Sequence, residues 1–356
     1  MKWRYLLFPF ALLYGTIAAL RRWFYRSGVC KSYHSVIPTI VVGNLRVGGT
    51  GKTPHTEYLL ALTKEWGRSA LVSRGYGRKT KGFLLANNLS EEQQTARNIG
   101  DEPMQILRKF PTTIVAVSEK RAIALKELEK LTPPIQLAVL DDAFQHLPIA
   151  AGLKIVLTEY ADPYYADLPL PAGNLREFAS AAKSADIIIV TKSPENLLRD
   201  EADKIKEKLR LAKKQHCFYT RYIYNNINPQ NRKAENIQIS SSTPALLLTG
   251  IANPKPMIRY LSEQFTLIEH LEYRDHYDFK LHDLEKIKRG YEKLGEQAIM
   301  VTTEKDYARL QSSAISKEMD QFPIFVLPVR IDFLFDEKKN FNTIIEDYVR
   351  KNTKNS

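Results

Sequence analysis

The chain has 356 residues, with 52 Lys and Arg against 40 Asp and Glu, so its formal net charge is +12. At roughly 100–200 residues per domain, this length predicts two domains, each large enough to bury its own core. Hydrophobic residues make up 44% and charged residues 26%, which excludes a disordered, collagen-like or multi-span membrane chain. The sequence has two cysteines, Cys30 and Cys217, too few for a disulfide framework or a Cys-rich zinc site, so we expect a reducing compartment.

The positive charge is concentrated at the start of the chain. Residues 1–56 contain eight Lys or Arg and no acidic residue; the first acidic residue is Glu57. A nucleic-acid-binding protein would carry its excess charge along a helix or a sheet face. A basic segment that is also apolar and aromatic is typical of a membrane surface, so we expect a lipid surface and no nucleic acid as partner.

An uncharged run at residues 5–20 lies between Arg4 and Arg21. As a helix it would span about 24 Å, short of the roughly 30 Å hydrocarbon core of a bilayer. The run is similar to the apolar part of a signal peptide, but Arg21 and Arg22 stand where the small residues of a cleavage site should be. We therefore predict a membrane-associated helix over residues 1–30, lying flat or shallowly inserted. A core helix buried at the edge of the first domain is the alternative.

Short apolar runs alternate with amphipathic stretches of helix length from residue 38 on. This alternation predicts a mostly parallel sheet with helices on both faces. The strands expected in this first series are 39–44, 70–74, 113–117, 137–141, 154–158 and 186–191. They predict a first α/β domain over residues 31–216.

The pattern changes at residues 217–242, where two extended pieces, 217–224 and 235–240, flank a polar stretch. These pieces predict a hairpin or β-ribbon linker. A second series follows, with strands expected at 244–250, 265–271, 298–303 and 322–329. We predict from it a second, smaller α/β domain over residues 243–356 that closes over the first.

The strongest chemical signal is GGTGKT at residues 48–53, directly between a predicted strand and a helical stretch. A phosphate-binding loop needs this order, because backbone N–H groups and a helix N-terminus must converge on the phosphate. Lys52 would bridge β- and γ-phosphate oxygens, and the Thr53 hydroxyl would ligate Mg²⁺. Arg46 stands in place of the first glycine of the strict pattern. We predict an α/β fold of the P-loop NTPase type with ATP and Mg²⁺ as cofactors; a plain glycine-rich turn is the alternative.

Asp141 and Asp142 directly follow the apolar run 137–140. A carboxylate at the end of a second strand is the arrangement that places a metal ligand beside a phosphate loop. Acid pairs after apolar runs also occur in ordinary turns, but the presence of a phosphate loop in the same sequence favours a metal site.

A phosphate loop does not by itself define the reaction. A GTPase should carry an Asn/Thr-Lys-x-Asp guanine reader, and neither residues 190–196 nor 302–308 fit that spacing. Guanine is therefore disfavoured and not excluded. Two classes are favoured at this point: a kinase, and a membrane-associated partitioning or targeting ATPase that hydrolyses ATP to cycle on and off a partner. A nucleic-acid-binding ATPase is a less favoured third class, because the placement of the charge suits a membrane surface better.

Further strings occur in order between about residues 40 and 310: GNLRVGGTGKTP, SRGYGRK, GDEP, SEKR, LDDAFQH, LPAGNLRE, TGIANP, RDHYDF and TTEKD. Together they resemble the tetraacyldisaccharide 4'-kinase family of the lipid A pathway. The resemblance implies a kinase that transfers the γ-phosphate of ATP to the 4'-hydroxyl of a tetraacyl glucosamine disaccharide 1-phosphate. Such a substrate is anionic and stays in the bilayer, so its kinase would work at the membrane–water interface.

The resemblance also implies catalytic residues. Asp101 in GDEP matches the catalytic base, and His276 in RDHYDF matches a histidine that assists it. A carboxylate can accept the hydroxyl proton, and a hydrogen-bonded imidazole can orient the carboxylate. Because the two lie in different predicted domains, the site would be complete only when the domains close. Lys52 and Arg121 are the cationic members, with Arg121 stabilising charge on the transferred group.

The remaining predicted site residues fall into three groups. The predicted nucleotide-binding residues are Val47, Gly48, Gly49, Thr50, Gly51, Lys52, Thr53 and Pro54. The predicted metal ligands are Thr53, Asp141, Asp142 and Glu177, and the predicted substrate-binding residues are Asn44, Glu102, His146 and Arg176. Surface ion pairs are the alternative for the Arg and Glu side chains, and a bond to a buried backbone group is the alternative for His146. We expect a monomer at the cytoplasmic face of a bacterial inner membrane.

Overall fold

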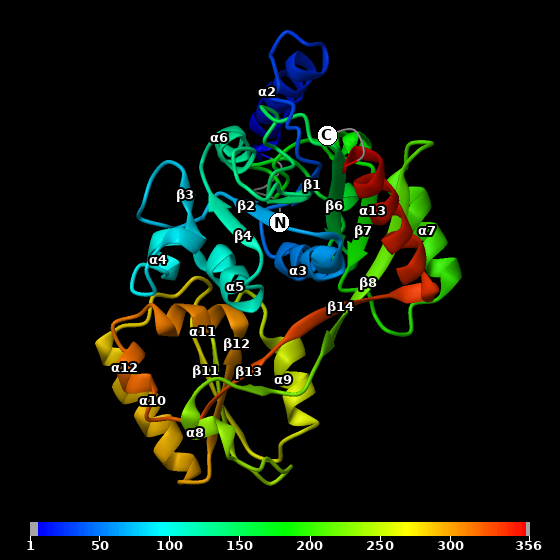
Figure 1. Ribbon diagram of the computed structural model, residues 1–356. Coiled ribbons are helices and arrows are strands. Elements are labelled where there is room, and N and C mark those ends of the chain that lie inside the picture. Colours follow the sequence, from blue (N-terminus) through cyan, green and yellow to red (C-terminus); the bar gives the residue numbers. More distant parts are fainter. Residues whose placement is uncertain (1–5, 354–356) are drawn as a thin grey trace.

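The computed structural model describes residues 6–353, and this range contains a larger and a smaller β-sheet (Figure 1). Within it the larger sheet has nine strands in the order β14-β8-β7-β6-β1-β5-β2-β4-β3. In chain order they are β1 (Thr39–Asn44), β2 (Ser69–Ser73), β3 (Leu84–Leu85), β4 (Ile114–Val117), β5 (Leu137–Asp141), β6 (Leu153–Glu159), β7 (Ile187–Thr191), β8 (His216–Tyr224) and β14 (Val329–Phe333). The central strands pair in parallel, and β3 and β14 pair antiparallel at the two edges.

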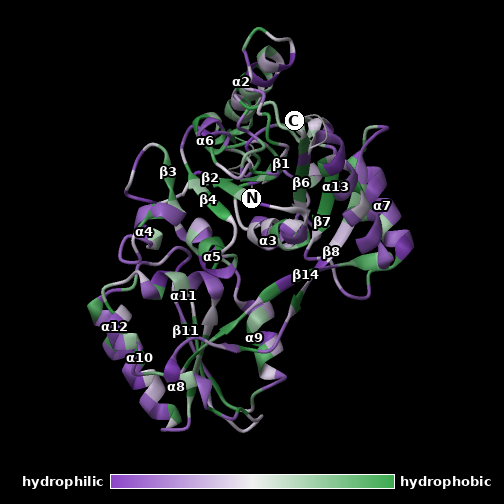
Figure 2. Ribbon diagram, in the orientation of Figure 1, coloured by the Kyte–Doolittle hydropathy of each residue, from purple (hydrophilic) through white to green (hydrophobic). Residues whose placement is uncertain are grey.

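Helices cover both faces of the larger sheet, which confirms the predicted α/β fold. Successive residues of a strand point to opposite faces, so Ile40 and Val42 of β1 pack on one side and Val41 on the other. The first side carries α3 (Lys52–Thr63), α4 (Ala96–Ile99), α5 (Asp101–Lys109) and α13 (Lys338–Thr353), and the second carries α6 (Arg121–Leu128) and α7 (Arg199–Leu209). Every residue of β1 is buried, as expected of a parallel strand covered on both faces. Figure 2 shows hydrophobic residues in the central strands and hydrophilic ones on the outer helix α7.

The smaller sheet has five strands among the described residues, in the order β11-β10-β12-β13-β9. They are β9 (Asn228–Pro229), β10 (Ala245–Thr249), β11 (Ile268–Glu272), β12 (Ile299–Thr303) and β13 (Ile324–Leu327). The helices beside them are α8 (Arg232–Glu235), α9 (Lys255–Ser262), α10 (Leu281–Leu294), α11 (Glu304–Gln311) and α12 (Ser316–Met319). Separate apolar clusters lie on the two faces, one centred on Leu248 and Met300 and the other on Leu247 and Val301.

Two long antiparallel strands, β8 and β14, form the ribbon that connects the sheets (Figure 1). Their register pairs Thr220 with Phe333 and Tyr224 with Val329. The predicted ribbon therefore exists, but the expected pairing of 217–224 with 235–240 is wrong, because β8 takes its partner from about a hundred residues later in the chain.

The predicted extent of the second domain, 243–356, is wrong at its end. After β13 the chain returns to the larger sheet as β14, and α13 then packs on that sheet. Phe341, Ile345 and Val349 of α13 are buried against the β1 face. A stripe spaced by four residues is compatible with any apolar surface, so spacing alone cannot assign α13 to a domain.

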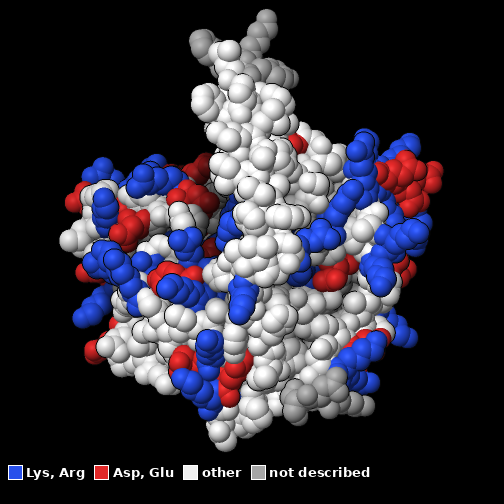
Figure 3. All heavy atoms as spheres, turned by 90° about the horizontal axis from the view of Figure 1, so that it is seen from above, with Lys and Arg blue, Asp and Glu red and all other residues white. Residues whose placement is uncertain are grey.

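Helix α2 (Phe8–Arg26) projects from the larger domain. Figure 3 shows it as an uncharged projection, with basic side chains on the body beside it. Its buried residues are Ala11 and Gly15, and a Cβ on Gly15 would lie 2.5 Å from the Phe178 ring. Its exposed side chains include Phe8, Phe10, Leu12, Leu13, Tyr14, Ile17, Leu20 and Trp23. The alternative of a helix buried in the core is therefore wrong; the first residues of the predicted segment, 1–5, lie outside the described range.

Candidate active site

The predicted phosphate loop, residues 48–53, connects β1 to α3. Gly48 and Gly51 have φ angles of 118° and 91°, the left-handed region that favours glycine. Gly51 directly precedes α3, and a Cβ there would lie 2.5 Å from the Tyr222 hydroxyl oxygen of β8. Lys52 and Thr53 begin the helix, so the unpaired N–H groups of its first turn point out of the helix N-terminus, as phosphate binding requires.

Side chains from the ends of β1 and β7, and from the residue that follows β7, form hydrogen bonds with this loop. Asn44 is fully buried and donates from Nδ2 to Thr50 Oγ1 over 2.9 Å. The Thr191 hydroxyl donates to the Thr50 carbonyl over 3.0 Å, and Lys192 Nζ donates to the Gly49 carbonyl over 2.6 Å. Asn44 thus stabilises the loop through a buried hydrogen bond. Substrate binding by Asn44 stays a prediction. Lys192 was not predicted as a site residue.

The acid pair lies at the end of β5, which is the neighbour of β1 in the sheet. Lys52 Nζ is 3.7 Å from Asp142 Oδ1. Arg176 Nη1 donates to both carboxylate oxygens of Asp142, over 2.8 and 3.0 Å. Burial raises the pKa of Asp142, but Lys52 and Arg176 outweigh it and hold the pKa below its usual value. Asp142 is therefore an anion held between two cations beside the loop.

Asp141 has a different environment. It is 8% exposed, and its buried Oδ1 has no hydrogen-bond partner among the described residues. Burial, together with the charges of Asp142 and Glu102, raises the pKa of Asp141 to about 6. A buried carboxylate oxygen without a donor is costly unless a cation neutralises it, so this pair fits a divalent ion. The described residues contain no cluster of three or more His, Cys, Asp or Glu that could hold a metal; Mg²⁺ is typically bound through one or two carboxylates, waters and substrate phosphates.

Arg121 and His146 lie beside the acid pair. Arg121 is 6% exposed, so its predicted alternative, a surface ion pair, is wrong. Its Nη2 donates to the Asp142 carbonyl over 3.4 Å, while its Nε and the Nε2 atom of His146 are buried without partners in residues 6–353. Burial and the charge of Arg121 lower the pKa of His146 to about 4. A neutral imidazole and a guanidinium with an unused N–H are groups that a phosphorylated, hydroxyl-bearing ligand could satisfy.

Glu177 contacts the N-terminal helix. Both of its carboxylate oxygens accept hydrogen bonds from Arg22, each over 2.7 Å, and the Arg22 guanidinium lies 4.7 Å from the centre of the Phe144 ring. This bidentate pair ties α2 to the larger domain. Metal binding by Glu177 stays a prediction, and it would require Glu177 to share an oxygen with Arg22 or to release it.

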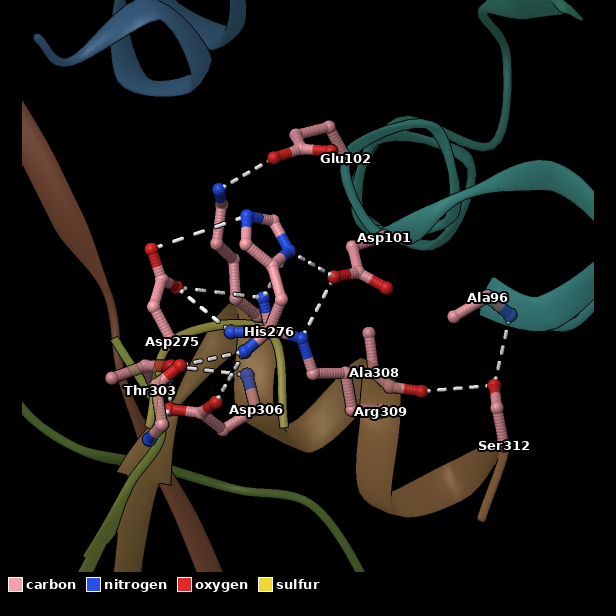
Figure 4. A network of polar contacts seen from close by, with 12 residues as sticks. Ala96, Asp101, Glu102, Asp275, His276, Thr303, Asp306, Ala308, Arg309 and Ser312 are labelled. Carbon is pink, nitrogen blue, oxygen red and sulfur yellow. Dashed lines mark hydrogen bonds and ion pairs between the residues drawn. The ribbon is translucent and has the colours of Figure 1, made fainter. Parts of the chain in front are cut away.

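Asp101 and His276 meet across the domain boundary (Figure 4). His276 Nδ1 lies 3.0 Å from Asp101 Oδ2. Gly100 directly precedes α5 and lies close to the backbone at Gly75. A Cβ on Gly100 would lie 2.8 Å from the Gly75 Cα atom, so this close approach requires glycine. Burial raises the pKa of Asp101, but His276 and Arg309 outweigh it, so the net shift is downward. The hydrogen bond to Asp101 raises the pKa of His276.

Two cations of α11 that the sequence reasoning missed complete this region. Lys305 Nζ donates to Glu102 Oε1 over 2.6 Å, and Arg309 Nε donates to Asp101 Oδ2 over 2.8 Å. Glu102 thus forms an ion pair, as its alternative predicted, but the pair is largely buried between the domains and does not lie on the surface. Substrate binding by Glu102 stays a prediction. The available signal was the spacing: two cations four residues apart lie on one face of a helix.

Kinases combine a phosphate-binding loop with a carboxylate that can accept the proton of the acceptor hydroxyl. This chain is an enzyme of that class. It belongs to the tetraacyldisaccharide-1-P 4'-kinase family, whose model matches residues 3–350. A tetraacyldisaccharide 4'-kinase from Bacteroides thetaiotaomicron is 39% identical, with the match covering 100% of this chain and 95% of that protein. One from Flavobacterium johnsoniae is 41% identical over 98% of both chains.

A solved structure is similar over nearly the whole length. It is the crystal structure of LpxK from Aquifex aeolicus in complex with ATP, which matches 97% of this chain and 99% of that chain with a TM-score of 0.74 and 27% sequence identity. The resemblance drawn from the ordered strings is thus confirmed at the level of family and fold, and ATP use is supported. The partitioning ATPase is not favoured.

Proposed function

We infer that this protein transfers the γ-phosphate of ATP to the 4'-hydroxyl of a tetraacyl glucosamine disaccharide 1-phosphate. The observation that carries the proposal is the Asp101–His276 pair, which joins a carboxylate of the domain that holds the phosphate loop to a histidine of the smaller domain. An ATPase that only hydrolyses nucleotide has no need of a carboxylate that is shared between two domains. Membership of the kinase family supports the same reading.

In the proposed mechanism, the loop N–H groups and Lys52 bind the β- and γ-phosphates. Asp101 accepts the proton of the acceptor hydroxyl while the acceptor oxygen attacks the γ-phosphorus. Because phosphoryl transfer has a loose transition state, the main contribution of Asp101 is to align the attacking oxygen. Arg121 would stabilise charge on the transferred group through its guanidinium.

Asp141, Asp142 and the Thr53 hydroxyl are the residues that would hold Mg²⁺. The buried, unpartnered Oδ1 of Asp141 and the position of Thr53 at the start of α3 support this assignment. The ion would neutralise charge on the β- and γ-phosphates when bound. Arg176 donates to Asp142 and so keeps its carboxylate oriented at the end of β5.

We further propose that α2 lies in the headgroup region at the cytoplasmic face of the inner membrane. Its exposed residues are large and apolar, and Arg21 and Arg26 follow at its end, which is the composition of an interfacial helix. None of the described helices combines the length and the apolarity needed to cross a bilayer. A lipid-linked acceptor would then reach the site from the surface on which α2 rests.

The test is a transfer assay with vesicles, ATP labelled at its γ-phosphate and a tetraacyldisaccharide 1-phosphate acceptor. We expect label in the lipid fraction only when the acceptor is present. Release of labelled inorganic phosphate with no labelled lipid would instead support the partitioning ATPase.

A further inference from the structure

Arg309 lies at the junction of the two domains, and its side chain is only 5% exposed. From the smaller domain its Nε donates to Asp101 Oδ2 over 2.8 Å. Its Nη1 donates to the Gly250 carbonyl over 2.8 Å and to Asp306 Oδ1 over 2.9 Å. Its Nη2 lies 3.1 Å from His276 Nδ1. One guanidinium therefore reaches both members of the proposed catalytic pair (Figure 4).

The guanidinium is held rigidly on its own domain. Asp306 is fully buried and accepts two further hydrogen bonds, from the Gly250 N–H over 2.9 Å and from the Thr303 hydroxyl over 2.7 Å. Thr303 in turn caps α11 by accepting from the Asp306 N–H. Because Asp306 is fixed by these bonds, it fixes the plane of Arg309 and the direction of the Nε–H bond toward Asp101.

The hydrogen bonds to Asp101 fall on one of its two oxygens. His276 and Arg309 both contact Oδ2, whereas Oδ1 takes no hydrogen bond from any described residue. When hydrogen bonds hold one oxygen of a carboxylate in place, the other oxygen points in a fixed direction. Oδ1 is thus the oxygen free to receive the acceptor hydroxyl.

The contacts of His276 explain why a cation is needed here. Its Nδ1 faces a carboxylate, which accepts hydrogen bonds, and a guanidinium, which donates them. When Nδ1 carries a proton it can donate to Asp101, and when Nδ1 is unprotonated it can accept from Arg309. The ring therefore has a complementary partner in either state and keeps its orientation as protons move.

We propose that Arg309 is a positioning residue of the transfer reaction, which clamps Asp101 Oδ2 and the His276 ring across the domain boundary so that Asp101 Oδ1 meets the acceptor hydroxyl. The inference rests on the proposed role of Asp101 as base. In the transfer, the acceptor oxygen bonds to the γ-phosphorus as the bond to the ADP oxygen breaks, and the hydroxyl proton passes to Asp101. Lysine cannot replace Arg309, because an ammonium lacks the planar fork that reaches all four partners, Asp101, Gly250, Asp306 and His276, at once.

The experiment compares Arg309→Gln, Arg309→Lys and the wild type in the vesicle assay from pH 5 to 9. We expect kcat to fall about ten- to a hundredfold in both variants, at or below the low end of the roughly 10²–10⁴-fold contribution of a general base, because Asp101 is misaligned but present; the KM for ATP should stay within about threefold. In Arg309→Gln the acid limb of the kcat profile moves to higher pH, because Asp101 has lost a neighbouring cation. In Arg309→Lys the charge remains, so the limb stays near its wild-type position while kcat is low. The matched control is Arg289→Gln on the exposed face of α10, which should change neither.

Thermal unfolding and ATP binding, measured on the same samples, separate positioning from folding. Wild-type kcat and an unmoved acid limb in Arg309→Gln would overturn the inference. So would a loss of activity that merely follows the loss of folded protein, with an unchanged pH profile. If the wild type itself transfers no phosphate to lipid, the proposed function fails and the inference falls with it; if the wild type is active and only the Arg309 variants are unaffected, the inference alone fails.

Discussion

The two halves of the proposed site are built in different ways. The phosphate half consists of the loop 48–53, Asp141 and Asp142, and it comes from neighbouring parallel strands of one sheet. The acceptor half joins Asp101 of the larger domain to His276 of the smaller one. One half is therefore complete within a single domain, and the other exists only where two domains touch.

Ion pairs hold the boundary between the two domains. They join α5 to α11 as Asp101–Arg309 at 2.8 Å, Glu102–Lys305 at 2.6 Å and Lys109–Glu304 at 2.7 Å. Separating two buried charges returns both of them to water, which offsets much of the attraction that is lost, so such a boundary can open without unfolding either sheet. Nucleotide binding and acceptor chemistry should accordingly respond to different substitutions.

Lys52→Ala is expected to have the largest effect, because it breaks the phosphate half on which both steps depend. Removing a charge-stabilising group from a phosphoryl-transfer site costs about a thousandfold or more in kcat. ATP affinity should fall as well, while the thermal unfolding temperature stays near the wild-type value. Transfer rates and ATP binding measured together check this; retained turnover would refute the role of Lys52.

Asp101→Asn tests the acceptor half alone. Asn keeps the size of the side chain but is a poor proton acceptor, so transfer to lipid should fall about a hundredfold, within the range for a general base. ATP binding should stay unchanged, since Asp101 does not belong to the loop. Isothermal titration with ATP beside the transfer assay separates the two. Near-normal transfer by this variant would remove Asp101 as the base.

The phosphate half could be predicted from the sequence because it is local. Apolar runs of strand length predict the bounds of β1 and β5 nearly to the residue. The glycines of residues 48–53 indicate a loop whose backbone angles favour glycine. The acceptor half lacks such a signal. Asp101 and His276 were found through family resemblance, and Arg309 was missed because a cation on an amphipathic helix usually faces solvent.

Errors in the predicted fold have the same origin. The ribbon residues 217–224 show extended character, but not that β14, about a hundred residues later, pairs with them. Likewise α13 has an apolar stripe that would fit either sheet. Pairing across long stretches of chain depends on which surfaces meet, and a local pattern carries no information on that choice.

The double variant Leu13→Glu/Ile17→Glu tests whether binding of α2 to a lipid surface brings the lipid acceptor to the acceptor half of the site. Both side chains are about 60% exposed on α2, at 61% and 60%, and burying each in lipid would contribute roughly 1.5–3 kcal/mol. We expect vesicle partition and kcat/KM for the lipid acceptor to fall at least about tenfold, with ATP affinity unchanged. Leu281→Glu, 64% exposed on α10, is the control. Unaltered vesicle sedimentation of the double variant would contradict the membrane role of α2.

Glu57→Gln should have the smallest effect, and it concerns the boundary between the two domains. Glu57 of α3 is 5% exposed and accepts from Gln105 and from Lys109, each over 2.7 Å; Lys109 also reaches Glu304 of α11. Burial, and then the charge of Glu304, raises the pKa of Glu57 to about 7. The folded protein therefore keeps a proton that the unfolded chain releases near pH 4.3, so the free energy of unfolding falls as pH rises from about 4.5 to 7.

Glutamine at position 57 removes this loss, since it carries no charge to bury. The unfolding temperature of Glu57→Gln, relative to wild type, should rise by about 2–4 °C between pH 5 and pH 8. Thermal unfolding in a pH series checks it, with Glu285→Gln, 76% exposed on α10, as a control whose offset should not vary. Parallel curves for Glu57→Gln and wild type would mean that Glu57 is already ionised at pH 5. The boundary would then be charged throughout this pH range, and pH would leave the contact between the two domains unchanged.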